Sequence, residues 1–306
     1  MSRLLAIDWG SSSLRGALID DAGAVLEQRS APKGMLTVDA GGFDGVFEAT
    51  FGDWMDVPGT RCLMAGMVGS RQGWVEAPYR PCPAGLDDYA GSLQRVGDRS
   101  SRGRDIAIVP GATCEHDGMP DVMRGEEIKI VGVLDLLGTG DARIVSPGTH
   151  SKWCRVEGGR LIAFSTAMSG EFYALLSRHS ILAHSVSDDA DDALDEAAFD
   201  SGVERAFAGR GLLQNAFSVR TFALFERMPA AARASYLSGL VIGEELRGRD
   251  LEGTGAVALV GADALTARFA RALASRGVVS RSFGDEAAWR GLWCIDRRRC
   301  ELEGTR

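Results

Sequence analysis

Two apolar runs flank a turn of small residues in the stretch Leu4-Leu5-Ala6-Ile7-Asp8-Trp9-Gly10-Ser11-Ser12-Ser13-Leu14-Arg15-Gly16-Ala17-Leu18-Ile19-Asp20. This arrangement predicts a hairpin. Small residues let backbone N–H groups approach an anion closely, and the aspartate that ends the first run can hold Mg²⁺ directly or through water. The stretch therefore indicates a nucleotide site, although by itself it fits a plain hairpin turn equally well.

The same arrangement recurs near the middle of the chain. Strands are predicted at 142–146, 152–156 and 160–164, and the small-residue turn Pro147-Gly148-Thr149-His150-Ser151 joins the first two. The order of strand, tight polar turn, strand, turn and strand matches residues 3–29, which is a weak repeat in structure rather than in letters. The repeat favours two similar domains that each contribute one hairpin to a shared cleft.

The other expected elements are helices and buried strands. Apolar residues three or four positions apart predict amphipathic helices at 43–55 and 126–137. The acidic run at 187–192 lacks the spacing of a calcium loop and favours an acidic helix start. Strands are expected at 3–8, 14–20, 24–29, 62–68, 105–109, 256–260 and 278–282, and helical segments at 169–249, 265–276 and 285–294.

The composition is that of a globular protein of 306 residues. Hydrophobic residues make up 45% and charged residues 25% of the chain, which gives ample core. The net charge of −8 makes nucleic acid and anionic membranes poor partners, and no stretch approaches the length of a membrane span. Six cysteines without a C-x-x-C pair favour a reducing compartment, so we expect a cytoplasmic protein. The basic run at 297–299 is expected to be a solvated helix end.

Two common phosphate-binding motifs are missing from the sequence. Gly-Lys never occurs, which excludes the G-x-x-x-x-G-K-[ST] loop, and no G-x-G-x-x-G opens a helix after a strand. The remaining candidates are the two hairpin turns and the glycine after the strand at 256–260, in Gly261-Ala262.

Taken in order, five segments resemble the 2-dehydro-3-deoxygalactonokinase family of the actin-like ATPase superfamily. The two hairpins and the Gly261 turn are similar to the phosphate-1, phosphate-2 and adenosine motifs of that superfamily, and the resemblance runs from residue 3 to about residue 293. The segments are Ala6-Ile7-Asp8-Trp9-Gly10-Ser11, Met64-Ala65-Gly66-Met67-Val68-Gly69-Ser70, Val122-Met123-Arg124-Gly125-Glu126-Glu127, Pro147-Gly148-Thr149-His150-Ser151-Lys152-Trp153 and Ser238-Gly239-Leu240-Val241-Ile242-Gly243.

The resemblance implies two ribonuclease H-like domains around a central nucleotide cleft, here residues 1–124 and 125–306, with the last helix packing back on the first domain. It implies phosphorylation of 2-dehydro-3-deoxy-D-galactonate at its terminal 6-hydroxyl in galactonate breakdown, with ATP and Mg²⁺ as cofactors. Two alternatives stay open: a kinase for another small sugar or sugar acid, and a nucleotide-gated binding protein of the same superfamily. The oligomeric state is also open, with a homodimer as one option.

The first hairpin is expected to bind the end of ATP, because phosphoryl transfer needs alignment and charge neutralisation. Asp8 should position Mg²⁺, and backbone amides around Gly10, Ser11 and Ser12 should meet the γ-phosphate. Arg15 leaves the hairpin tip, where it either reaches phosphate or is a solvated strand charge.

The second hairpin and the Gly261 turn complete the expected nucleotide site. Gly148 and Thr149 should face the β- and γ-phosphates from the other wall. Gly261 and Ala262 should pass close to adenine or ribose; by themselves they also fit an ordinary strand-to-helix turn.

The acceptor hydroxyl needs a carboxylate to orient it and take its proton. Related carbohydrate kinases use the aspartate of a Gly-Asp-Gln that begins a helix before the second hairpin, and this chain has Gly125-Glu126-Glu127 there. We therefore expect Glu126 to be the base, with Glu127 and Glu171 as rivals. The alternative is that Glu126 only caps its helix, where the dipole favours it.

The carboxylate of a sugar acid is well matched by a planar guanidinium. Arg124, beside the expected base, is the first choice, and Arg71 is the second. Ser70 and Trp74 lie on the same loop as Arg71 and are expected to assist, since related kinases hold sugar hydroxyls there.

Overall fold

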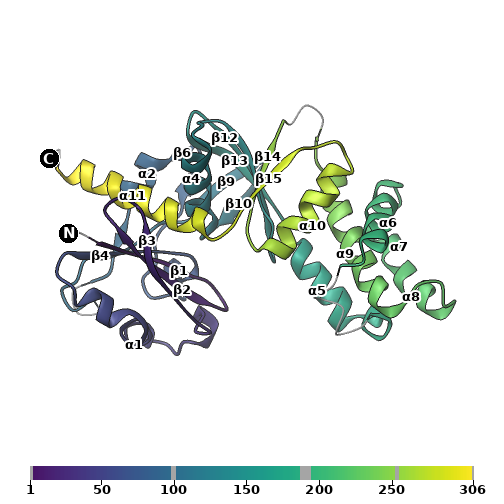
Figure 1. The fold of residues 1–306 in the computed structure, drawn as a ribbon, viewed down its shortest axis with the longest axis horizontal. Helices are drawn as coiled ribbons and strands as arrows, with labels where there is room; N and C mark the ends of the chain where they lie inside the picture. Colours follow the sequence, from purple (N-terminus) through teal and green to yellow (C-terminus); the bar gives the residue numbers. More distant parts are fainter. Residues whose placement is uncertain (1–2, 98–100, 187–193, 252–254, 305–306) are drawn as a thin grey trace. The chain divides into compact units, whose positions relative to one another are not determined.

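Three β-sheets and the helices that cover them make up the fold in a computed structural model (Figure 1). The structure describes residues 3–97, 101–186, 194–251 and 255–304. Contacts divide the chain into two compact units. The first comprises Met1–Ile144, Cys154–Ser165 and Phe283–Arg306, and the second comprises Val145–Trp153 and Thr166–Ser282. The expected domain boundary between residues 124 and 125 stays a prediction.

The first sheet contains the opening hairpin as its second and third strands. Its strand order is β3-β2-β1-β4-β8-β7, in which β1 pairs antiparallel with β2 and parallel with β4. The predicted strands of residues 3–29 are confirmed, and Asp8 stands opposite Arg15. The bounds are β1 Arg3–Trp9, β2 Leu14–Asp20, β3 Val25–Ala31, β4 Thr60–Ala65, β7 Gln94–Arg95 and β8 Ile106–Ile108.

The strand expected at 62–68 ends three residues earlier than predicted, at Ala65. Gly66 has φ 99°, a conformation outside the extended region that glycine adopts readily. A 3₁₀ turn, η2 (Met67–Gly69), follows directly. The apolar residues at 62–68 therefore correctly predict burial, but they overestimate the length of the strand.

Helices cover both faces of the first sheet. On one face α1 (Phe43–Met55) buries Phe47 and Phe51, with the 3₁₀ turn η1 (Met35–Thr37) beside the hairpin. On the other face α11 (Glu286–Gly304) buries Trp289 and Leu292 against the sheet. The expectation that the last helix packs back on the first domain stays a prediction, like the domain boundary itself.

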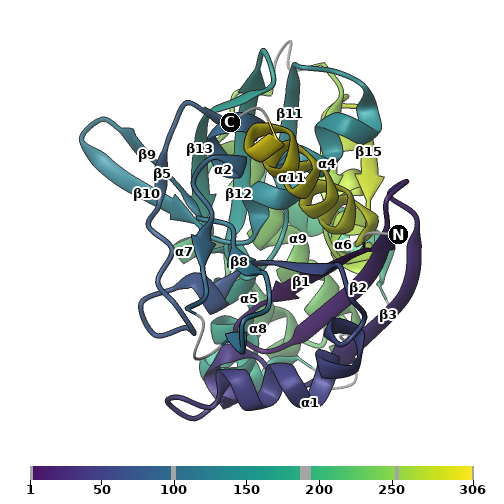
Figure 2. The same ribbon diagram turned by 90° about the vertical axis from the view of Figure 1, so that its left-hand side faces the viewer.

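Two glycines bring α11 close to α4 (Glu126–Leu137), and Figure 2 shows the two helices side by side. A Cβ at Gly132 would lie 1.8 Å from the carbonyl oxygen of Ala287, and a Cβ at Gly291 would lie 1.8 Å from that of Ile128. No larger residue fits at either position, so the two backbones touch directly.

Two further sheets follow along the chain. A three-stranded sheet has the order β10-β9-β5, and a six-stranded sheet has the order β15-β14-β11-β12-β13-β6. The boundary between the compact units passes through β11, β12 and β13 of the larger sheet. The bounds are β5 Arg80–Pro81, β6 Ala84–Gly85, β9 Ala112–His116, β10 Met119–Met123, β11 Ala142–Ser146, β12 Ser151–Glu157, β13 Arg160–Ala167, β14 Val257–Val260 and β15 Ser280–Phe283; α2 is Leu86–Ala90.

The second unit is largely helical, as predicted. Its central pair, α6 and α9, again packs through glycines: a Cβ at Gly239 would lie 2.0 Å from the carbonyl oxygen of Phe199. The acidic run at 187–192 lies outside the described residues. The bounds are α5 Ser169–His179, η3 Ile181–Ser185, α6 Glu196–Phe207, α7 Leu212–Asn215, α8 Phe217–Leu224, α9 Ala230–Arg247 and α10 Asp263–Ala274.

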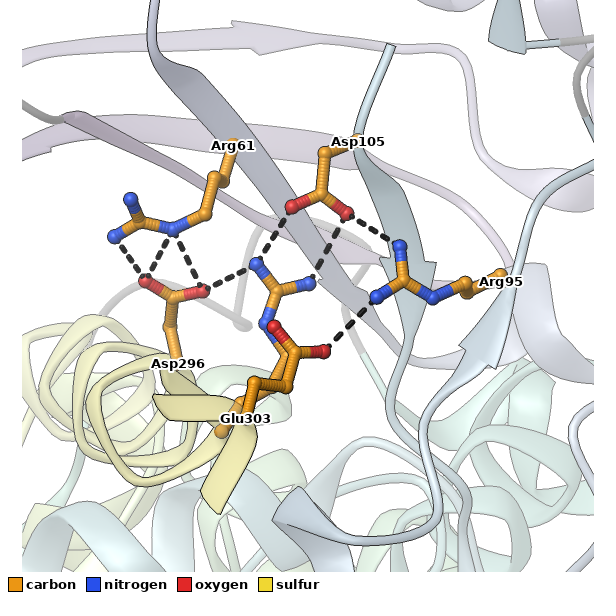
Figure 3. Close-up of polar contacts among 6 residues, drawn as sticks. Arg61, Arg95, Asp105, Asp296 and Glu303 are labelled. Atoms are coloured by element: carbon orange, nitrogen blue, oxygen red, sulfur yellow. Dashed lines mark hydrogen bonds and ion pairs between the residues drawn. The ribbon is translucent and has the colours of Figure 1, made fainter. Parts of the chain in front are cut away.

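The last helix extends ten residues beyond its expected end at 294. An ion-pair cluster holds its final turns: Arg299, only 4% exposed, pairs with Asp105 and Asp296, while Arg61 also pairs with Asp296 (Figure 3). The expectation of a solvated basic run is therefore wrong for Arg299. Within the described ranges, every helix is either too short or too polar to serve as a membrane span. None of the six cysteines, all of which lie in the described ranges, forms a disulfide bond.

Candidate active site

The tip of the first hairpin presents backbone N–H groups. The carbonyl oxygens of Gly10 and Ser11 accept hydrogen bonds from the N–H groups of Met35 and Leu36, at 2.9 and 3.1 Å. Among the residues that the structure describes, the N–H groups of Ser11 and Ser12 have no hydrogen-bond partner. Consecutive free amides at a tight turn suit an oxyanion such as a phosphate.

The Asp8 carboxylate ends β1 below this tip, with 12% of its side chain exposed. Arg15 Nη2 donates to Asp8 Oδ2 at 2.7 Å, and Arg15 Nη1 donates to Asp285 Oδ1 at 2.6 Å. Burial opposes the charged form of Arg15, but the two carboxylates raise its pKa above the ordinary value. Arg15 thus lies between two carboxylates, and its contact with phosphate stays a prediction.

Two glycines bring Asp8 close to the start of α4. A Cβ at Gly66 would lie 2.7 Å from the carbonyl oxygen of Trp9 and 3.3 Å from Oδ1 of Asp8. Gly125, the N-cap of α4, has φ 108°, and a Cβ there would lie 3.2 Å from Cα of Gly66. There is therefore little room for a side chain at Gly66 beside the Asp8 carboxylate, and the turn that carries Glu126 closely approaches the Gly66 backbone.

The two glutamates of that turn differ in environment. Glu126 is partly exposed, and its Oε2 accepts a hydrogen bond from the Arg124 N–H at 3.1 Å. Glu127 is fully buried, and its Oε2 accepts from the Gly125 N–H at 2.7 Å. Burial raises the pKa of Glu127 to about 8, with a further contribution from Glu126. Of the two, Glu126 is the more accessible carboxylate, and its role as base stays a prediction.

Arg124 contacts three residues of the loop that follows Gly66. Its Nη2 donates to the Ala77 carbonyl oxygen at 2.8 Å, its Cζ lies 4.3 Å from the centroid of the Tyr79 ring, and a Cβ at Gly69 would lie 3.0 Å from Nη1. The Nε and Nη1 atoms are buried without a hydrogen-bond partner in the described part of the chain. Unsatisfied guanidinium donors favour an anionic oxygen acceptor.

The other three expected substrate residues lie in different surroundings. Arg71 has a side chain that is 82% exposed and lies 3.6 Å from Glu76. Ser70 is buried. Trp74 packs edge-on against Trp9 with ring centroids 6.3 Å apart. Arg71 is therefore the residue of this loop that is freest to move toward a ligand.

In the second unit, the second hairpin rests on the start of α5. The N–H of Glu171 donates to the Thr149 carbonyl oxygen at 3.0 Å, and a Cβ at Gly170 would lie 2.3 Å from the carbonyl oxygen of Gly148. His150 Nε2 lies 2.5 Å from Glu171 Oε2. Thr149 and His150 are exposed at the tip, so Glu171 is engaged with the hairpin itself.

A small, partly open pocket lies beside this hairpin, within the second unit. Gly261 abuts the hairpin, because a Cβ there would lie 3.2 Å from the Pro147 carbonyl oxygen, and Ala262 is exposed at the start of α10. A mostly apolar pocket with a few polar side chains is typical of a small-molecule site. Its lining includes Gly148, Ser151, Tyr173, Ser238, Ile242 and Arg268.

Two long-range contacts at these sites have no signal in the sequence. Asp285 contributes to the Asp8 site from the far end of the chain, and Glu245 accepts a hydrogen bond from the Trp153 indole N–H, directly after the second hairpin. The positive φ of Gly125 was within reach, since this glycine precedes the helix predicted at 126–137, whereas Gly66 lies inside the strand predicted at 62–68 and gave no such signal.

Together, the fold and the two hairpins define the actin-like ATPase fold, to which ATP-dependent sugar kinases belong. The activator of 2-hydroxyisocaproyl-CoA dehydratase from Clostridium difficile, solved with bound ADPNP, shares this fold with a TM-score of 0.52 at 12% identity, over 99% of this chain and 98% of its own. That likeness establishes the fold class.

Closer relatives identify the family. The chain is 39% identical to a provisionally named 2-dehydro-3-deoxygalactonokinase of Rhizobium meliloti and 34% identical to 2-dehydro-3-deoxygalactonokinase of Escherichia coli, over 94% and 96% of this chain and 94% and 97% of those proteins. A solved structure from Sinorhizobium meliloti, provisionally given the same name, has a TM-score of 0.86 at 37% identity over 97% of this chain and 98% of its own. The 2-keto-3-deoxy-galactonokinase family model matches residues 8–295, and the chain belongs to this family.

Proposed function

We propose that this chain transfers the γ-phosphoryl group of ATP to the 6-hydroxyl of 2-dehydro-3-deoxy-D-galactonate, giving the 6-phosphate and ADP in galactonate breakdown. Two relatives with this name match it over nearly their whole length. The observation that carries the proposal is that Gly66 lies near both the Asp8 carboxylate and Gly125, so that a metal-positioning carboxylate and a candidate base flank the same glycine.

In the proposed reaction, the 6-hydroxyl oxygen attacks the γ-phosphorus while the bond from that phosphorus to the β,γ-bridging oxygen breaks. Glu126 orients the hydroxyl and takes its proton. The free N–H groups of Ser11 and Ser12 hold the γ-phosphate, with Gly148 and Thr149 on the β- and γ-phosphates. Arg124 or Arg71 holds the carboxylate of the substrate.

The Asp8 site fits a magnesium ion that arrives with ATP. Mg²⁺ commonly binds through one or two carboxylates together with phosphates and waters. No cluster of three or more acidic, histidine or cysteine ligands occurs in the described ranges, so a carboxylate-plus-phosphate site is the arrangement that suits this chain. Bound there, the ion would neutralise phosphate charge, and Asp8 would hold it directly or through water.

Two further parts of the proposal concern the whole molecule. Each of the domains 1–124 and 125–306 carries one phosphate-binding hairpin, and the pocket beside the second hairpin accepts the adenosine of ATP, near the turn of Gly261 and Ala262 that abuts this hairpin. The protein works in a reducing, cytoplasmic compartment, which agrees with six cysteines that form no disulfide bond.

A substrate panel tests this proposal. ADP release is measured with Mg·ATP alone and with 2-dehydro-3-deoxy-D-galactonate, its C4 epimer, and neutral sugars of the same length. We expect strong release only with the sugar acids and the fastest release with the galactonate compound. Slow release that no acid accelerates would contradict a kinase, and a faster rate with a neutral sugar would contradict the substrate.

A further inference from the structure

We infer that Asp285 is a positioning residue for the Asp8 carboxylate and that it acts through Arg15. This inference rests on the proposed role of Asp8 toward Mg·ATP. Arg15 Nη2 donates to Asp8 Oδ2 at 2.7 Å while Arg15 Nη1 donates to Asp285 Oδ1 at 2.6 Å. One guanidinium therefore joins two carboxylates, of which only Asp8 lies at the hairpin.

The pairing of Asp8 with Arg15 is local, whereas the pairing with Asp285 is not. Asp8 and Arg15 stand opposite each other in the β1–β2 register, so the fold of the hairpin alone brings them together. Asp285 lies 270 residues from Arg15 in sequence and immediately precedes α11. Its presence at this site depends on how α11 docks on the sheet.

The start of α11 is firmly placed. The N–H of Gly284 donates to Glu286 Oε1 at 2.8 Å, and the carbonyl oxygen of Asp285 accepts from Ala288 at 3.0 Å. The next residue, Trp289, is buried against the first sheet. The Asp285 carboxylate is thus held by a rigid element, which is what a positioning group requires.

The exposed fractions of the three side chains show why a second carboxylate is useful. Asp8 is 12% exposed, Arg15 32% and Asp285 54%. Paired with Arg15 alone, a nearly buried Asp8 would be neutralised by a cation that competes with Mg²⁺ for the same oxygens. Asp285 shares that cation and keeps it hydrogen-bonded when Asp8 turns toward the metal.

Calorimetric titration with ADP, in excess Mg²⁺ and separately in EDTA, tests this inference. The variants are Asp285→Asn, Arg15→Gln and the double variant. The control is Asp135→Asn, which breaks a different ion pair of α11, with Arg290. For Asp285→Asn we expect the Kd of Mg·ADP to rise about three- to tenfold, with a change of less than about twofold in EDTA, since a partly exposed pair has a modest effect.

The double variant separates positioning from a general charge effect. If Asp285 acts through Arg15, its substitution changes the Kd of Mg·ADP by less than about twofold in the Arg15→Gln background, as a double-mutant cycle requires. The control should match the wild type. Equal weakening in Mg²⁺ and EDTA, an undiminished effect without Arg15, or an unchanged Kd in Asp285→Asn would each overturn the inference. A wild-type chain that binds no Mg·ADP would instead overturn the proposed function.

Discussion

The indole N–H of Trp153 donates a hydrogen bond of 2.6 Å to Oε1 of Glu245, which lies 92 residues further along the chain. Trp153 follows the second hairpin on β12, and Glu245 lies on α9, the helix that also contributes Ser238 to the pocket. Burial raises the pKa of Glu245, although hydrogen bonds from Ser169 and Trp153 act in the opposite direction. A nearly buried carboxylate therefore connects β12, which follows the hairpin, to α9, which lines the pocket.

Replacing Glu245 should lower both the stability of the fold and the affinity for nucleotide. In Glu245→Leu the indole N–H loses its acceptor, so we expect the free energy of unfolding to fall by about 1–3 kcal/mol. Nucleotide affinity should fall as well, because Trp153 directly follows the hairpin, whose residues Gly148 and Ser151 line the pocket. Urea unfolding and ADP titration measure the two effects.

The neighbouring glutamate gives a matched control. Glu244 is on the same helix but pairs with Arg247 at the surface, so Glu244→Leu should cost less than about 1 kcal/mol. Glu245→Gln keeps an acceptor for the indole and should recover most of the stability. Equal losses in the two leucine variants would show that Glu245 has no special role.

The buried Glu127 should make stability depend on pH. Its pKa is about 8 in the folded chain, above its ordinary value of 4.5, so between these values the folded state holds a proton that the unfolded state has released. The protonated Glu127 therefore contributes fully to the unfolding free energy below about pH 4.5, and this contribution is lost as the pH rises toward 8. The expected slope is up to about 1.4 kcal/mol per pH unit in the unfolding free energy.

The variant Glu127→Gln has no carboxyl group at this position and should lack that slope. The unfolding free energy of the variant minus that of the wild type, measured in urea from pH 5 to pH 8, should therefore increase steadily with pH. The exposed Glu115 serves as the control position for the same substitution. A difference between Glu127→Gln and the wild type that stays constant with pH would contradict the raised pKa.

The hairpins could be predicted because their signals are local. Small residues at 10–13 and 147–151 lie between short apolar runs, and neither feature needs a distant partner to be recognised. The close approach of Gly66 to Gly125 was not predicted, although both glycines lie in recognised motifs. A sequence shows that a glycine permits positive φ, but it does not show which backbone comes near it.

Long-range pairs explain most of what the sequence could not predict. Asp285 and Glu245 appear as ordinary charges in helical surroundings, and only docking gives each one its partner. The length of α11 has the same cause: its last turns repeat no apolar pattern, and ion pairs to Arg61 and Asp105 hold them instead. Ion pairs between residues that are far apart in the chain produce no periodic pattern in the sequence.

Glu126→Gln should separate chemistry from binding. If Glu126 takes the proton of the acceptor hydroxyl, kcat should fall by about 10²–10⁴-fold, while the Kd of Mg·ADP changes by less than about twofold. Coupled ADP release and calorimetry measure the two quantities. Glu127→Gln and Glu171→Gln are the comparison variants, and a loss of this size in either one, with Glu126→Gln unimpaired, would move the base to that residue.

Removing the charge of Arg124 should raise the KM of the sugar acid more than removing the charge of Arg71. Arg124 has two buried guanidinium nitrogens without a partner among the described residues, whereas the Arg71 side chain is 82% exposed. A lost charged hydrogen bond costs about 1.5–3 kcal/mol, so Arg124→Met should raise the KM of the sugar acid about tenfold or more. Arg71→Met should change it less than about threefold. A larger effect at Arg71 would assign the substrate carboxylate to the loop.

Arg299 should be the most costly charge to remove from α11. Its Nη2 lies 2.8 Å from Asp105 Oδ2 and 3.1 Å from Asp296 Oδ1, in the cluster drawn in Figure 3. Burial lowers the pKa of Arg299, but its acidic partners more than offset this, so it stays charged. In Arg299→Met the Asp296 side chain, only 3% exposed, loses one of its two cations but keeps Arg61, so we expect a loss of about 1.5–3 kcal/mol in unfolding free energy.

Arg297 is the matched control because it belongs to the same basic run and is 57% exposed. Arg297→Met should cost less than about 0.5 kcal/mol in the same urea titration. If the two variants unfold alike, the cluster contributes nothing beyond a solvated helix end. If Arg299→Met also weakens Mg·ADP binding, the two ends of α11 are coupled, since Asp285 lies at the other end of this helix and reaches the Asp8 site through Arg15.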